Sequence, residues 1–561
     1  MLSLTPFSLL LGALAIRSAS AVAVWGQCGG SAYSGSAACE QNSTCVVLNE
    51  GYSQCQPASA LTSRQDTFTN PVLWEDLADL DVFRVDDTFY YSASTMHYSP
   101  GAPILQSKDL ANWEFIGHSV PSLDFGSNNY NLPGGGAQAY VKGIWASTLR
   151  FRSTTNTWYW IGCIEFSKTY IYTASSVTGP WQQASVLNTC YYDVGLLIDD
   201  DGTMFVAYGN TEIHVAQLSD DGLSEVQNQL VYTSTVGTLE GSRFYKRDGA
   251  YYILTTKPAS DEWVLKSTNG PFGPYEIQAL VQSVRPPSGL NGGNPHQGGL
   301  VEAGNDAWYY MAFVDAYPGG RVPVLAPVTW SSDGWPSVQL DNGAWGASYS
   351  YPLSPQPLKS PTGIDEFSEL GPEWEWNHNP DNSRWSINSG LVLQTATVTN
   401  DLYAARNTLT HRILGPKSSG TIVLDISNMA DGDRAGLSML RDVSASIGVK
   451  QTGSTRELFM INGMTMNSNW GTSSTGSEVA TATLSGNQVW LRATADIAPG
   501  GSNSATFSYS TDGSTFTNLG DTLKMNTDWQ FFMGYRFGIF NFATTALGGS
   551  VTVKSFEMQE A

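Results

Sequence analysis

Five chemistry-bearing residues each precede a strand-like segment of this sequence at nearly the same distance. Each segment is centred on an aromatic residue or methionine, and the chemistry-bearing residue lies ten to thirteen positions before it. In chain order these residues are Asp79, Trp145, Asp193, Glu240 and His296. Only 14% of the chain is charged, against about 25% in an average soluble protein, so three carboxylic acids in one register are notable.

Carboxylic acids that face one sugar can perform glycoside hydrolysis. One acid must hold a proton for the leaving oxygen, and a second must be ionised to activate water or to attack the sugar. A third carboxylate can keep the acid protonated, because like charges raise one another's pKa values. Asp79, Asp193 and Glu240 therefore predict such chemistry, provided that the fold brings them together.

The elements that would bring them together form an internal repeat. Five segments share a turn followed by an aromatic-rich strand, at intervals of 69, 46, 47 and 57 residues. Each is followed by a second strand and turn. The repeats are centred on Phe89, Trp158, Met204, Tyr251 and Trp308. Five such units predict a five-bladed β-propeller, whose inner strands surround one central channel. The alternative is a β-sandwich with unrelated aromatic strands.

Composition excludes several classes of protein. The 561 residues hold 28 Lys and Arg against 50 Asp and Glu, a net charge of −22. This balance gives no basic footprint for nucleic acid. Hydrophobic residues make up 41% of the chain, which argues against disorder. The 56 glycines and 12% aromatic residues suit a chain of several β domains better than long helices.

The first residues read as an export signal. Residues 1–23 hold an apolar core from Leu9 to Ile16, followed by the small-residue exit SASAVA. This apolar run is shorter than the ~20 residues of a membrane-spanning helix, and we see no later candidate span. We therefore expect an extracellular, secreted protein without a membrane partner.

Six cysteines divide into a cluster and a distant pair. Cys28, Cys39, Cys45 and Cys55 fall within 28 residues, which indicates a small disulfide-stapled domain in a secreted chain. A zinc site is the competing interpretation, but no Cys-x-x-Cys pair is present. The other two, Cys163 and Cys190, could be bonded to each other or be buried thiols.

Residues 25–57 carry a specific set of motifs: WGQCGG, then YSG, cysteine gaps of ten, five and nine residues, and finally YSQC. This segment resembles the fungal family 1 carbohydrate-binding module, which binds cellulose. The resemblance implies the pairs Cys28–Cys45 and Cys39–Cys55.

The same resemblance implies a cellulose-binding face. Aromatic rings can lie flat on the C–H surface of a glucan, and the family's stacking positions match Trp25 and Tyr52, with Asn49 and Gln54 as polar partners. The family usually has a third aromatic ring where this chain has Gly51, so we expect two rings. The alternative is that both rings belong to the core of the small domain.

The repeat region carries motifs of its own: NPVL from Asn70, DLDVFRV from Asp79, GIWAS from Gly143, YDVGLLIDDDG from Tyr192, LEGSRFYKRDG from Leu239 and GRVPVLAPVTWSSDGWP from Gly320. Together they resemble glycoside hydrolase family 43. The family is a five-bladed propeller of inverting enzymes that act on arabinose- and xylose-containing polymers.

This resemblance implies specific roles. Asp79 matches the general base, Asp193 the acid that adjusts the pKa, and Glu240 the general acid. Three further positions match substrate-binding residues of the family: Trp145, His296 and Arg321.

Several positions have a second interpretation. DLDV replaces the usual Asp-Pro-Ser, so Asp81, two residues after Asp79, is a rival for the base. Glu165 could be a cleft carboxylate or an edge residue. Asp199, Asp200 and Asp201 suit a hairpin turn before Gly202. His296 could be structural or could contact an ion. We expect no required cofactor and no metal among the site ligands, with a structural Ca²⁺ in the channel as the alternative.

The last third of the chain changes character. Eight or more short strand-like stretches alternate with Gly, Ser and Asn turns, which predicts a β-sandwich. GPEWEWNHNPDNSRWSI from Gly371 resembles the start of the lectin-like domain that accompanies many members of this hydrolase family. That domain could be a structural support or could form one wall of the substrate cleft.

The sequence therefore predicts an all-β protein: signal 1–23, cellulose-binding module 24–57, linker 58–67, five-bladed propeller 68–360 and β-sandwich 361–561. We expect a monomeric hemicellulase that releases arabinofuranose from arabinoxylan by inversion, with Asp79 and Glu240 about 6.5–9.5 Å apart. The alternatives are an exo-β-1,4-xylosidase with the same three residues, an endo-acting arabinan hydrolase, and a non-catalytic polysaccharide-binding protein.

Overall fold

The structure, a computed structural model, describes residues 21–41, 43–49, 51–57 and 67–561. Residues 1–20 of the expected signal and 58–66 of the expected linker lie outside the described residues. The chain divides into two compact units, residues 1–66 and 67–561. Among the described residues, none of the helices has the length and apolar character needed to cross a membrane.

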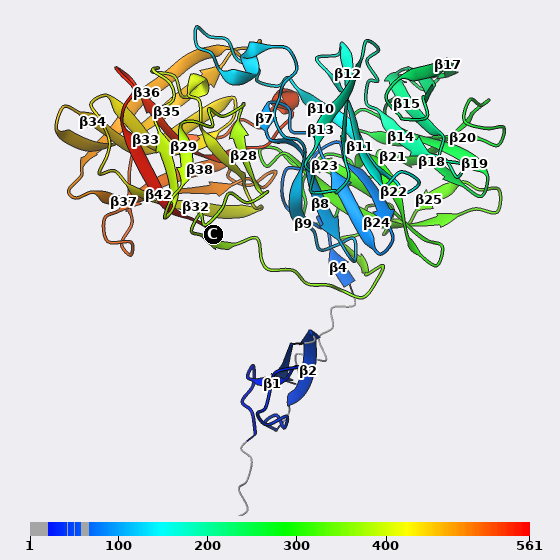
Figure 1. The fold of residues 1–561 in the computed structure, drawn as a ribbon, viewed down its shortest axis with the longest axis horizontal. Coiled ribbons are helices and arrows are strands. Elements are labelled where there is room, and N and C mark those ends of the chain that lie inside the picture. Colours follow the sequence, from blue (N-terminus) through cyan, green and yellow to red (C-terminus); the bar gives the residue numbers. More distant parts are fainter. Residues whose placement is uncertain (1–20, 42, 50, 58–66) are drawn as a thin grey trace, which may run out of the picture. The chain divides into compact units, whose positions relative to one another are not determined.

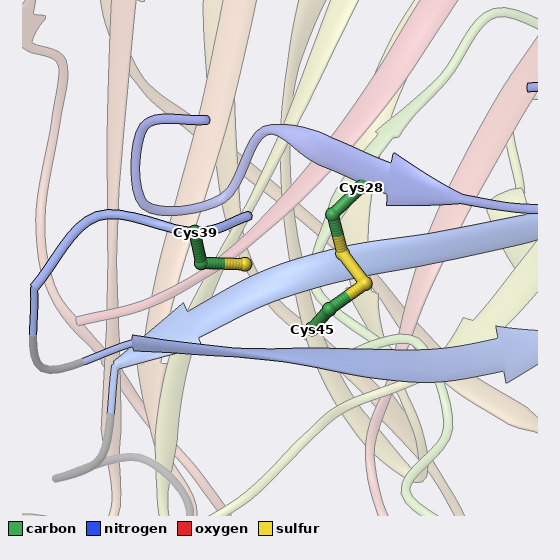
Figure 2. Close-up of side chains that lie close together, drawn as sticks. All are labelled: Cys28, Cys39 and Cys45. Atoms are coloured by element: carbon green, nitrogen blue, oxygen red, sulfur yellow. A yellow bond between two sulfur atoms is a disulfide. The ribbon is translucent and has the colours of Figure 1, made fainter. Parts of the chain in front are cut away.

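The first unit is a three-stranded antiparallel sheet in the order β1-β3-β2. Its strands are β1 (Gln27–Gly29), β2 (Ser43–Asn49) and β3 (Tyr52–Pro57). Disulfides join Cys28 to Cys45 and Cys39 to Cys55, as the resemblance implied. Figure 2 shows the first bridge with Cys39 beside it. So small a sheet buries little apolar area, and the two bridges supply the missing stability.

The second unit begins with five four-stranded antiparallel sheets, which are the blades of the predicted propeller (Figure 1). Blade one is β5 (Asp81–Val85), β6 (Thr88–Ser92), β8 (Gly101–Ser107) and β9 (Glu114–Val120). Blade two is β10 (Ile144–Arg152), β11 (Thr157–Ile164), β12 (Lys168–Ala174) and β13 (Gln182–Leu187). Blade three is β14 (Gly195–Ile198), β15 (Met204–Asn210), β16 (Glu212–Leu218) and β17 (Glu225–Thr233). Blade four is β18 (Glu240–Arg247), β19 (Ala250–Lys257), β20 (Asp261–Ser267) and β21 (Glu276–Gln282). Blade five is β22 (His296–Gly304), β23 (Ala307–Asp315), β24 (Arg321–Trp330) and β25 (Pro336–Val338).

The repeated turns have a local cause. Tight hairpins need positive φ at their central residues, which Asn, Asp and Gly tolerate best. In blade four, Asp248 and Gly249 have φ of 50° and 78°, and in blade five Asn305 and Asp306 have φ of 54° and 58°. The second strands that follow are buried and rich in aromatic and β-branched residues, as sheet interiors favour.

The blades close into a ring. The first strand of each blade contacts that of the next, and β22 of the last blade contacts β5 of the first. A short sheet also pairs the two ends of the propeller, β4 (Thr67–Thr69) with β26 (Ser348–Ser350). Thr67 thus belongs to a strand, where the sequence had placed the last residue of the linker. Cys163 of β11 is bonded to Cys190, which lies just before β14.

The C-terminal region is the predicted β-sandwich. One sheet has the order β29-β30-β42-β32-β37-β38-β39, with β27 on β42 and β40 on β38. The other has the order β36-β35-β34-β33-β41-β31-β28-β7. An apolar core including Leu391, Ile422, Val449, Leu491 and Ile539 fills the space between them.

The sandwich strands are accompanied in this unit by three short 3-10 helices. The first sheet holds β27 (Gly363–Asp365), β29 (Trp385–Ile387), β30 (Leu391–Gln394), β32 (Lys417–Asp425), β37 (Gln488–Asp496), β38 (Ser504–Ser510), β39 (Thr517–Asn518), β40 (Leu523–Lys524) and β42 (Ser550–Glu560). The second holds β7 (Tyr98–Ser99), β28 (Trp374–Asn377), β31 (Leu409–Arg412), β33 (Asp433–Leu440), β34 (Val443–Thr452), β35 (Thr455–Met466), β36 (Thr472–Thr483) and β41 (Arg536–Ala543). The helices are η1 (Asn128–Asn131), η2 (Leu402–Ala404) and η3 (Trp529–Phe531).

The propeller and the sandwich share a sheet. Strand β7 comes from the first blade's connection, yet it pairs with β28 of the sandwich through Ser99 and Trp376. Beside this seam, the buried carboxylate of Glu375 accepts hydrogen bonds from Arg412 and Arg536 and contacts His118 of β9. These contacts fix the sandwich against one side of the propeller.

Candidate active site

The five chemistry-bearing residues lie at one end of the propeller ring. Glu240 and His296 are the first residues of β18 and β22, and Trp145 is the second residue of β10. Asp79 and Asp193 each lie two residues before the inner strand of their blade, β5 and β14. The inner strands are neighbours around the ring, so the shared register places these side chains at one depth.

Both carboxylate oxygens of Asp79 accept hydrogen bonds. It is 4% exposed, and its Oδ1 accepts a hydrogen bond from Arg321 Nη1 at 2.7 Å. Its Oδ2 accepts one from Ser94 Oγ at 2.6 Å. Two donors, one of them a guanidinium, suit an ionised carboxylate. The backbone at Asp79 is left-handed, with φ of 54°, a conformation that clusters at functional sites.

Glu240 is arranged differently. Its Oε2 accepts hydrogen bonds from Tyr192 Oη at 3.1 Å and from Asn210 Nδ2 at 2.7 Å. Both neighbours donate to the same oxygen, so Oε1 is the oxygen that can carry a proton. Burial raises the pKa of Glu240, the negative charge of Asp79 raises it further, and the two hydrogen bonds lower it. A raised pKa is what a general acid requires.

Asp193 lies close enough to both other acids to interact with their charges. Burial raises the pKa of Asp193 well above its usual range, and Glu240 and Asp79 raise it further. Its Oδ2 accepts a hydrogen bond from the backbone N–H of Gly241, the residue after Glu240, at 3.1 Å. Asp193 and Glu240 therefore titrate as a pair, and the pair retains a proton to higher pH than an isolated carboxyl would.

Arg321 connects Asp79 to the sandwich. Its Nε donates to the backbone oxygen of Phe532 at 3.1 Å, and its own backbone N–H donates to Asp76 at 2.8 Å. The other carboxylate oxygen of Asp76 accepts from the N–H of Gly534, also at 2.8 Å. The guanidinium that holds Asp79 is thus positioned by residues of both domains.

Aromatic rings form a wall beside the acids. Trp145 packs against Phe166 and Phe532, with ring centroids 5.5 and 4.8 Å away. Phe166 also packs against Tyr192, the partner of Glu240, at 5.8 Å. Phe166 lies at the tip of the β11–β12 hairpin and is 59% exposed. Exposed rings of this kind can stack on sugars.

A groove of about 810 Å³ extends from this wall between the two domains. The propeller contributes Val141, Lys142, Trp145, Glu165 and Phe166, and the sandwich contributes Trp470, Trp529 and Phe532 among others. Trp529 is 56% exposed. The groove offers apolar rings and carboxylate and amide groups along one surface, as an extended saccharide site would.

His296 lies 4% exposed against the ring of Phe313, and its Nδ1 lies 2.8 Å from the backbone oxygen of Asn294. Within the described part of the chain, the one group of three His, Cys, Asp or Glu donors close enough to share an ion consists of cysteines of the first unit, whose sulfurs are bonded in disulfides.

The remaining candidates have other surroundings. Asp81, the rival base, is fully buried and bonds to Arg150 Nη1 at 2.5 Å and Thr148 Oγ1 at 2.7 Å. Asp199 to Asp201 form the turn between β14 and β15, as expected. Glu165 is exposed on the groove and accepts a hydrogen bond from Tyr130 Oη.

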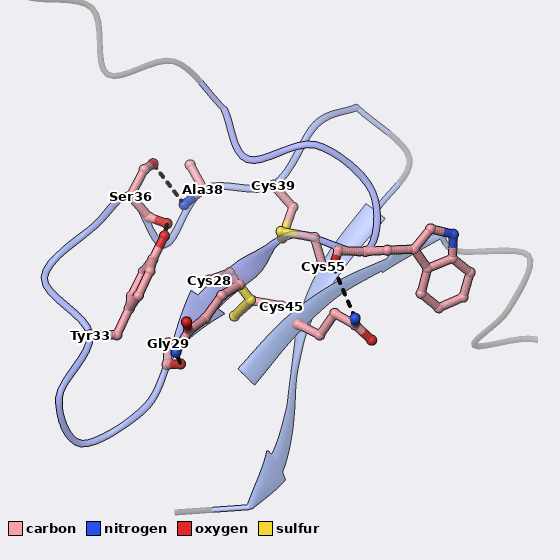
Figure 3. Close-up of a disulfide and its surroundings, with 11 residues drawn as sticks. Cys28, Gly29, Tyr33, Ser36, Ala38, Cys39, Cys45 and Cys55 are labelled. Atoms are coloured by element: carbon pink, nitrogen blue, oxygen red, sulfur yellow. Dashed lines mark hydrogen bonds between the residues drawn. A yellow bond between two sulfur atoms is a disulfide. The ribbon is translucent and has the colours of Figure 1, made fainter. Parts of the chain in front are cut away.

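The proposed cellulose-binding residues lie on the first unit. Trp25 is 56% exposed, and its backbone oxygen accepts a hydrogen bond from Gln54 Nε2 at 2.9 Å. Asn49 and Tyr52 are paired across β2 and β3, and Asn49 also caps the N–H of Gly51. Figure 3 shows the disulfide core with Tyr33 and Ser36 beside it. The exposure of Trp25 is more than a core ring would have.

Five residues beside the acids were not identified from the sequence. Ser94, Tyr192 and Asn210 donate hydrogen bonds to the carboxylates, and Phe166 and Phe532 pack against Trp145. Tyr192 lies directly before Asp193 in a recognised motif, and that position was the available signal, whereas Ser94 lies 15 residues after Asp79. Asn210 and Phe532 carry no local signal, because only the folded chain brings them to the site.

Comparison with known proteins agrees with this geometry. The sequence profile of glycosyl hydrolases family 43 matches residues 68–336. The profile of the β-xylosidase C-terminal Concanavalin A-like domain matches residues 364–559, and that of the fungal cellulose binding domain matches residues 24–52.

Three known proteins illustrate the likeness. A solved family 43 hydrolase, engineered to display both endo-xylanase and exo-arabinofuranosidase activity, is 49% identical, with a TM-score of 0.85 over 88% of this chain and 100% of that one. A β-xylosidase of Formosa agariphila is 29% identical over 566 residues, 87% of this chain and 90% of its own. A non-reducing end α-L-arabinofuranosidase of Bacteroides ovatus is 30% identical over 358 residues, 58% of this chain and 63% of its own.

The chain belongs to glycosyl hydrolase family 43. It is a glycosidase built from a five-bladed propeller and a Concanavalin A-like sandwich, with a fungal cellulose-binding domain at its N-terminal end. The non-catalytic alternative has no support from this membership.

Proposed function

We propose that the protein is a secreted, inverting hydrolase that releases α-L-arabinofuranose from arabinoxylan. The observation that carries this proposal is the contrast between two acids at one end of the channel. Asp79 accepts two hydrogen bonds and suits the ionised state, whereas Glu240 has one oxygen free of donors and a raised pKa.

The reaction follows from that contrast. Glu240 donates its proton to the glycosidic oxygen as the bond from that oxygen to the anomeric carbon breaks. Asp79 accepts a proton from a water molecule whose oxygen attacks the opposite face of the same carbon. The products are a free sugar of inverted configuration and the shortened polymer, with Asp79 protonated and Glu240 ionised until the two exchange protons with solvent.

Relatives support the choice of substrate. They include a β-xylosidase, an α-L-arabinofuranosidase and a hydrolase engineered to display both endo-xylanase and exo-arabinofuranosidase activity. The groove of about 810 Å³ beside Trp145 gives a polymer backbone room to lie across both domains. This arrangement favours a role of the sandwich as one wall of the cleft.

Replacing Phe532 by Ala should then raise KM on the polymer more than on a small aryl glycoside.

Product identification tests the proposal. The full chain is incubated with soluble arabinoxylan, and the first products are separated by chromatography, with Glu240→Gln as the inactive control. Arabinose as the first product supports the proposal. Xylose supports the second candidate, an exo-β-1,4-xylosidase, which the Formosa agariphila relative favours. Oligosaccharides as first products support an endo-acting enzyme, and no release of sugar overturns the assignment.

Secretion and cellulose anchoring complete the proposal. The signal-like residues 1–23 and the two disulfides of the first unit support an extracellular location. The exposed ring of Trp25 supports attachment to cellulose. Anchoring would keep the enzyme on the plant cell wall, where cellulose and arabinoxylan lie together. We expect a monomer without a required cofactor.

A further inference from the structure

A second cavity lies at the junction of propeller and sandwich, lined by none of the catalytic acids. It measures about 340 Å³. One wall comes from the start of the propeller and the strand β9, another from β28, β31 and β42 of the sandwich, and the outer side from residues 358–365, which connect the domains. Its size is at the lower end of the ~300–1,000 Å³ typical of small-molecule sites.

Aromatic side chains line the walls, although Trp374 and Phe556 are only 1% and 3% exposed. Trp113 and Phe115 line the propeller side, and Trp374 and Phe556 line the sandwich side. Trp113 is half-buried, and its indole N–H already donates to the backbone oxygen of Leu110 at 2.8 Å. Because the N–H group of Trp113 is already bonded, its ring can contact a ligand only by stacking. The C–H face of a sugar makes this kind of contact with aromatic side chains.

A buried carboxyl without a partner also faces the cavity. Glu75 is 3% exposed and lines the wall, and its Oε2 has no hydrogen-bond partner in the protein. Leaving such a group unpaired costs about 1–3 kcal/mol, so a hydroxyl from a bound molecule would satisfy it. His411 is oriented by its Nδ1, 2.6 Å from the backbone oxygen of Arg412, and Glu373 adds a second carboxyl to the wall.

The polar groups suit a neutral ligand better than a cation. Burial raises the pKa of Glu75 to about 7, even though Arg412 and Arg536 lower it, and burial also raises the pKa of Glu373. The carboxyl of Glu75 is therefore protonated at mildly acidic pH and can donate as well as accept. The described acids of this cavity do not converge as ligands of one metal ion.

We propose that this junction cavity binds a neutral saccharide of one or two rings, at a site separate from the catalytic acids. Trp113 supplies the stacking face, and Glu75 bonds a ring hydroxyl. Residues 358–365 cover the ligand, so binding orders the connection between the domains. The choice of a pentose probe rests on the proposed function, whereas the site itself does not.

The test measures binding at residues 358–365, which line the cavity. Hydrogen–deuterium exchange is followed in full-length Glu240→Gln protein with and without xylobiose, in peptides that cover residues 358–365. We expect xylobiose to slow exchange there. A Glu75→Ala replacement in the same background, which removes an unpaired group and should fold normally, should weaken the protection about tenfold in xylobiose concentration. Trp113→Ala should do the same.

Two controls separate this site from the others. Trp145→Ala alters the catalytic wall and should leave the protection of residues 358–365 intact, and Trp335→Ala is a matched Trp replacement elsewhere on the propeller. Protection confined to peptides around Glu240, or unchanged by Glu75→Ala, would overturn the proposal. Protection by the cation tetramethylammonium, with none by xylobiose, would also overturn the proposal, because the cavity would then bind a cation instead of a neutral saccharide. The experiment involves no turnover, so its failure is distinct from failure of the proposed activity.

Discussion

Asp79 and Glu240 differ in which of their oxygens are occupied. Both oxygens of Asp79 accept hydrogen bonds, from Arg321 and Ser94. Only one oxygen of Glu240 does, from Tyr192 and Asn210. The difference supports the proposed roles of Asp79 as the base and Glu240 as the acid. Arg321 can only donate to Asp79, which favours the ionised carboxylate, whereas Glu240 has an oxygen that can hold a proton.

Replacing either residue should abolish turnover of arabinoxylan. Asp79→Asn and Glu240→Gln preserve shape but remove the proton acceptor or donor, and we expect kcat to fall by about 10²–10⁴. On an aryl glycoside with a good leaving group, Glu240→Gln should lose much less, since the leaving oxygen needs no proton, whereas Asp79→Asn should remain inactive. The exposed turn variant Asp201→Asn is the control. Equal losses on both substrates for Glu240→Gln would contradict its role as the acid.

The pKa shifts at the acid pair predict a pH dependence. The pKa of Glu240 is raised, so the acid keeps its proton to higher pH, and activity is lost as pH rises through that value. Asp193 shares this titration with Glu240. Asp193→Asn removes the group that titrates together with Glu240, so Glu240 then titrates alone, below the upper pKa of the pair. The alkaline limb of the kcat/KM profile should therefore move to lower pH, and an unmoved limb would show that Asp193 does not act on Glu240.

At the scale of elements, each inner strand of the propeller presents one residue at its leading end. Asp81 shows how this register separates two similar acids. It lies on β5 itself, where it is buried among Thr148, Arg150 and Arg243, whereas Asp79 precedes the strand and faces the site. The two carboxylates are only two residues apart, yet Asp79 lies in the site, whereas Asp81 forms a structural ion pair between blades one and two.

Asp81→Asn should therefore damage stability rather than chemistry. Removing one partner of a buried ion pair costs about 3–5 kcal/mol, so the melting temperature should fall by several degrees. We expect the kcat of the folded fraction to stay within a few-fold of the unmodified enzyme. Thermal unfolding followed by circular dichroism, with kcat measured well below the transition, checks this. An unchanged melting temperature with lost activity would identify Asp81 as the base instead.

The repeat made the propeller predictable. It also made the shared position of the five chemistry-bearing residues predictable, because each lies at a similar spacing before the aromatic second strand of its blade. The partners were not predictable in the same way. Asn210 lies at the end of β15, and Phe532 follows η3 of another domain, so their contacts depend on packing between distant elements. The pairing of Cys163 with Cys190 and the shared strand β7 depend on such packing too.

At the scale of the whole molecule, the catalytic unit is one body that includes two domains. Asp76 bonds the backbone N–H groups of Arg321 and Gly534, and Arg441 of the sandwich lies over the ring of Tyr317 of the propeller. The sandwich thus helps to hold Arg321 against Asp79. The cellulose-binding unit is separate and has its own disulfides.

This division predicts that binding to cellulose and hydrolysis can be changed independently. Trp25→Ala removes an exposed ring, so the fraction bound to microcrystalline cellulose should fall about tenfold. Turnover of soluble arabinoxylan should stay unchanged. Tyr33→Phe, which removes only the hydroxyl that bonds to Ser36, is the matched control. Unchanged cellulose binding in Trp25→Ala would refute the proposed stacking face.

The most direct test of the account is the configuration of the first sugar released. Proton NMR of the reaction with arabinoxylan, recorded before the free sugar equilibrates, distinguishes the two anomers. Attack by water activated at Asp79 while Glu240 protonates the leaving oxygen predicts β-L-arabinofuranose as the first product of an α-linked substrate. First appearance of the α anomer would show retention of configuration and would contradict the assigned roles of both acids.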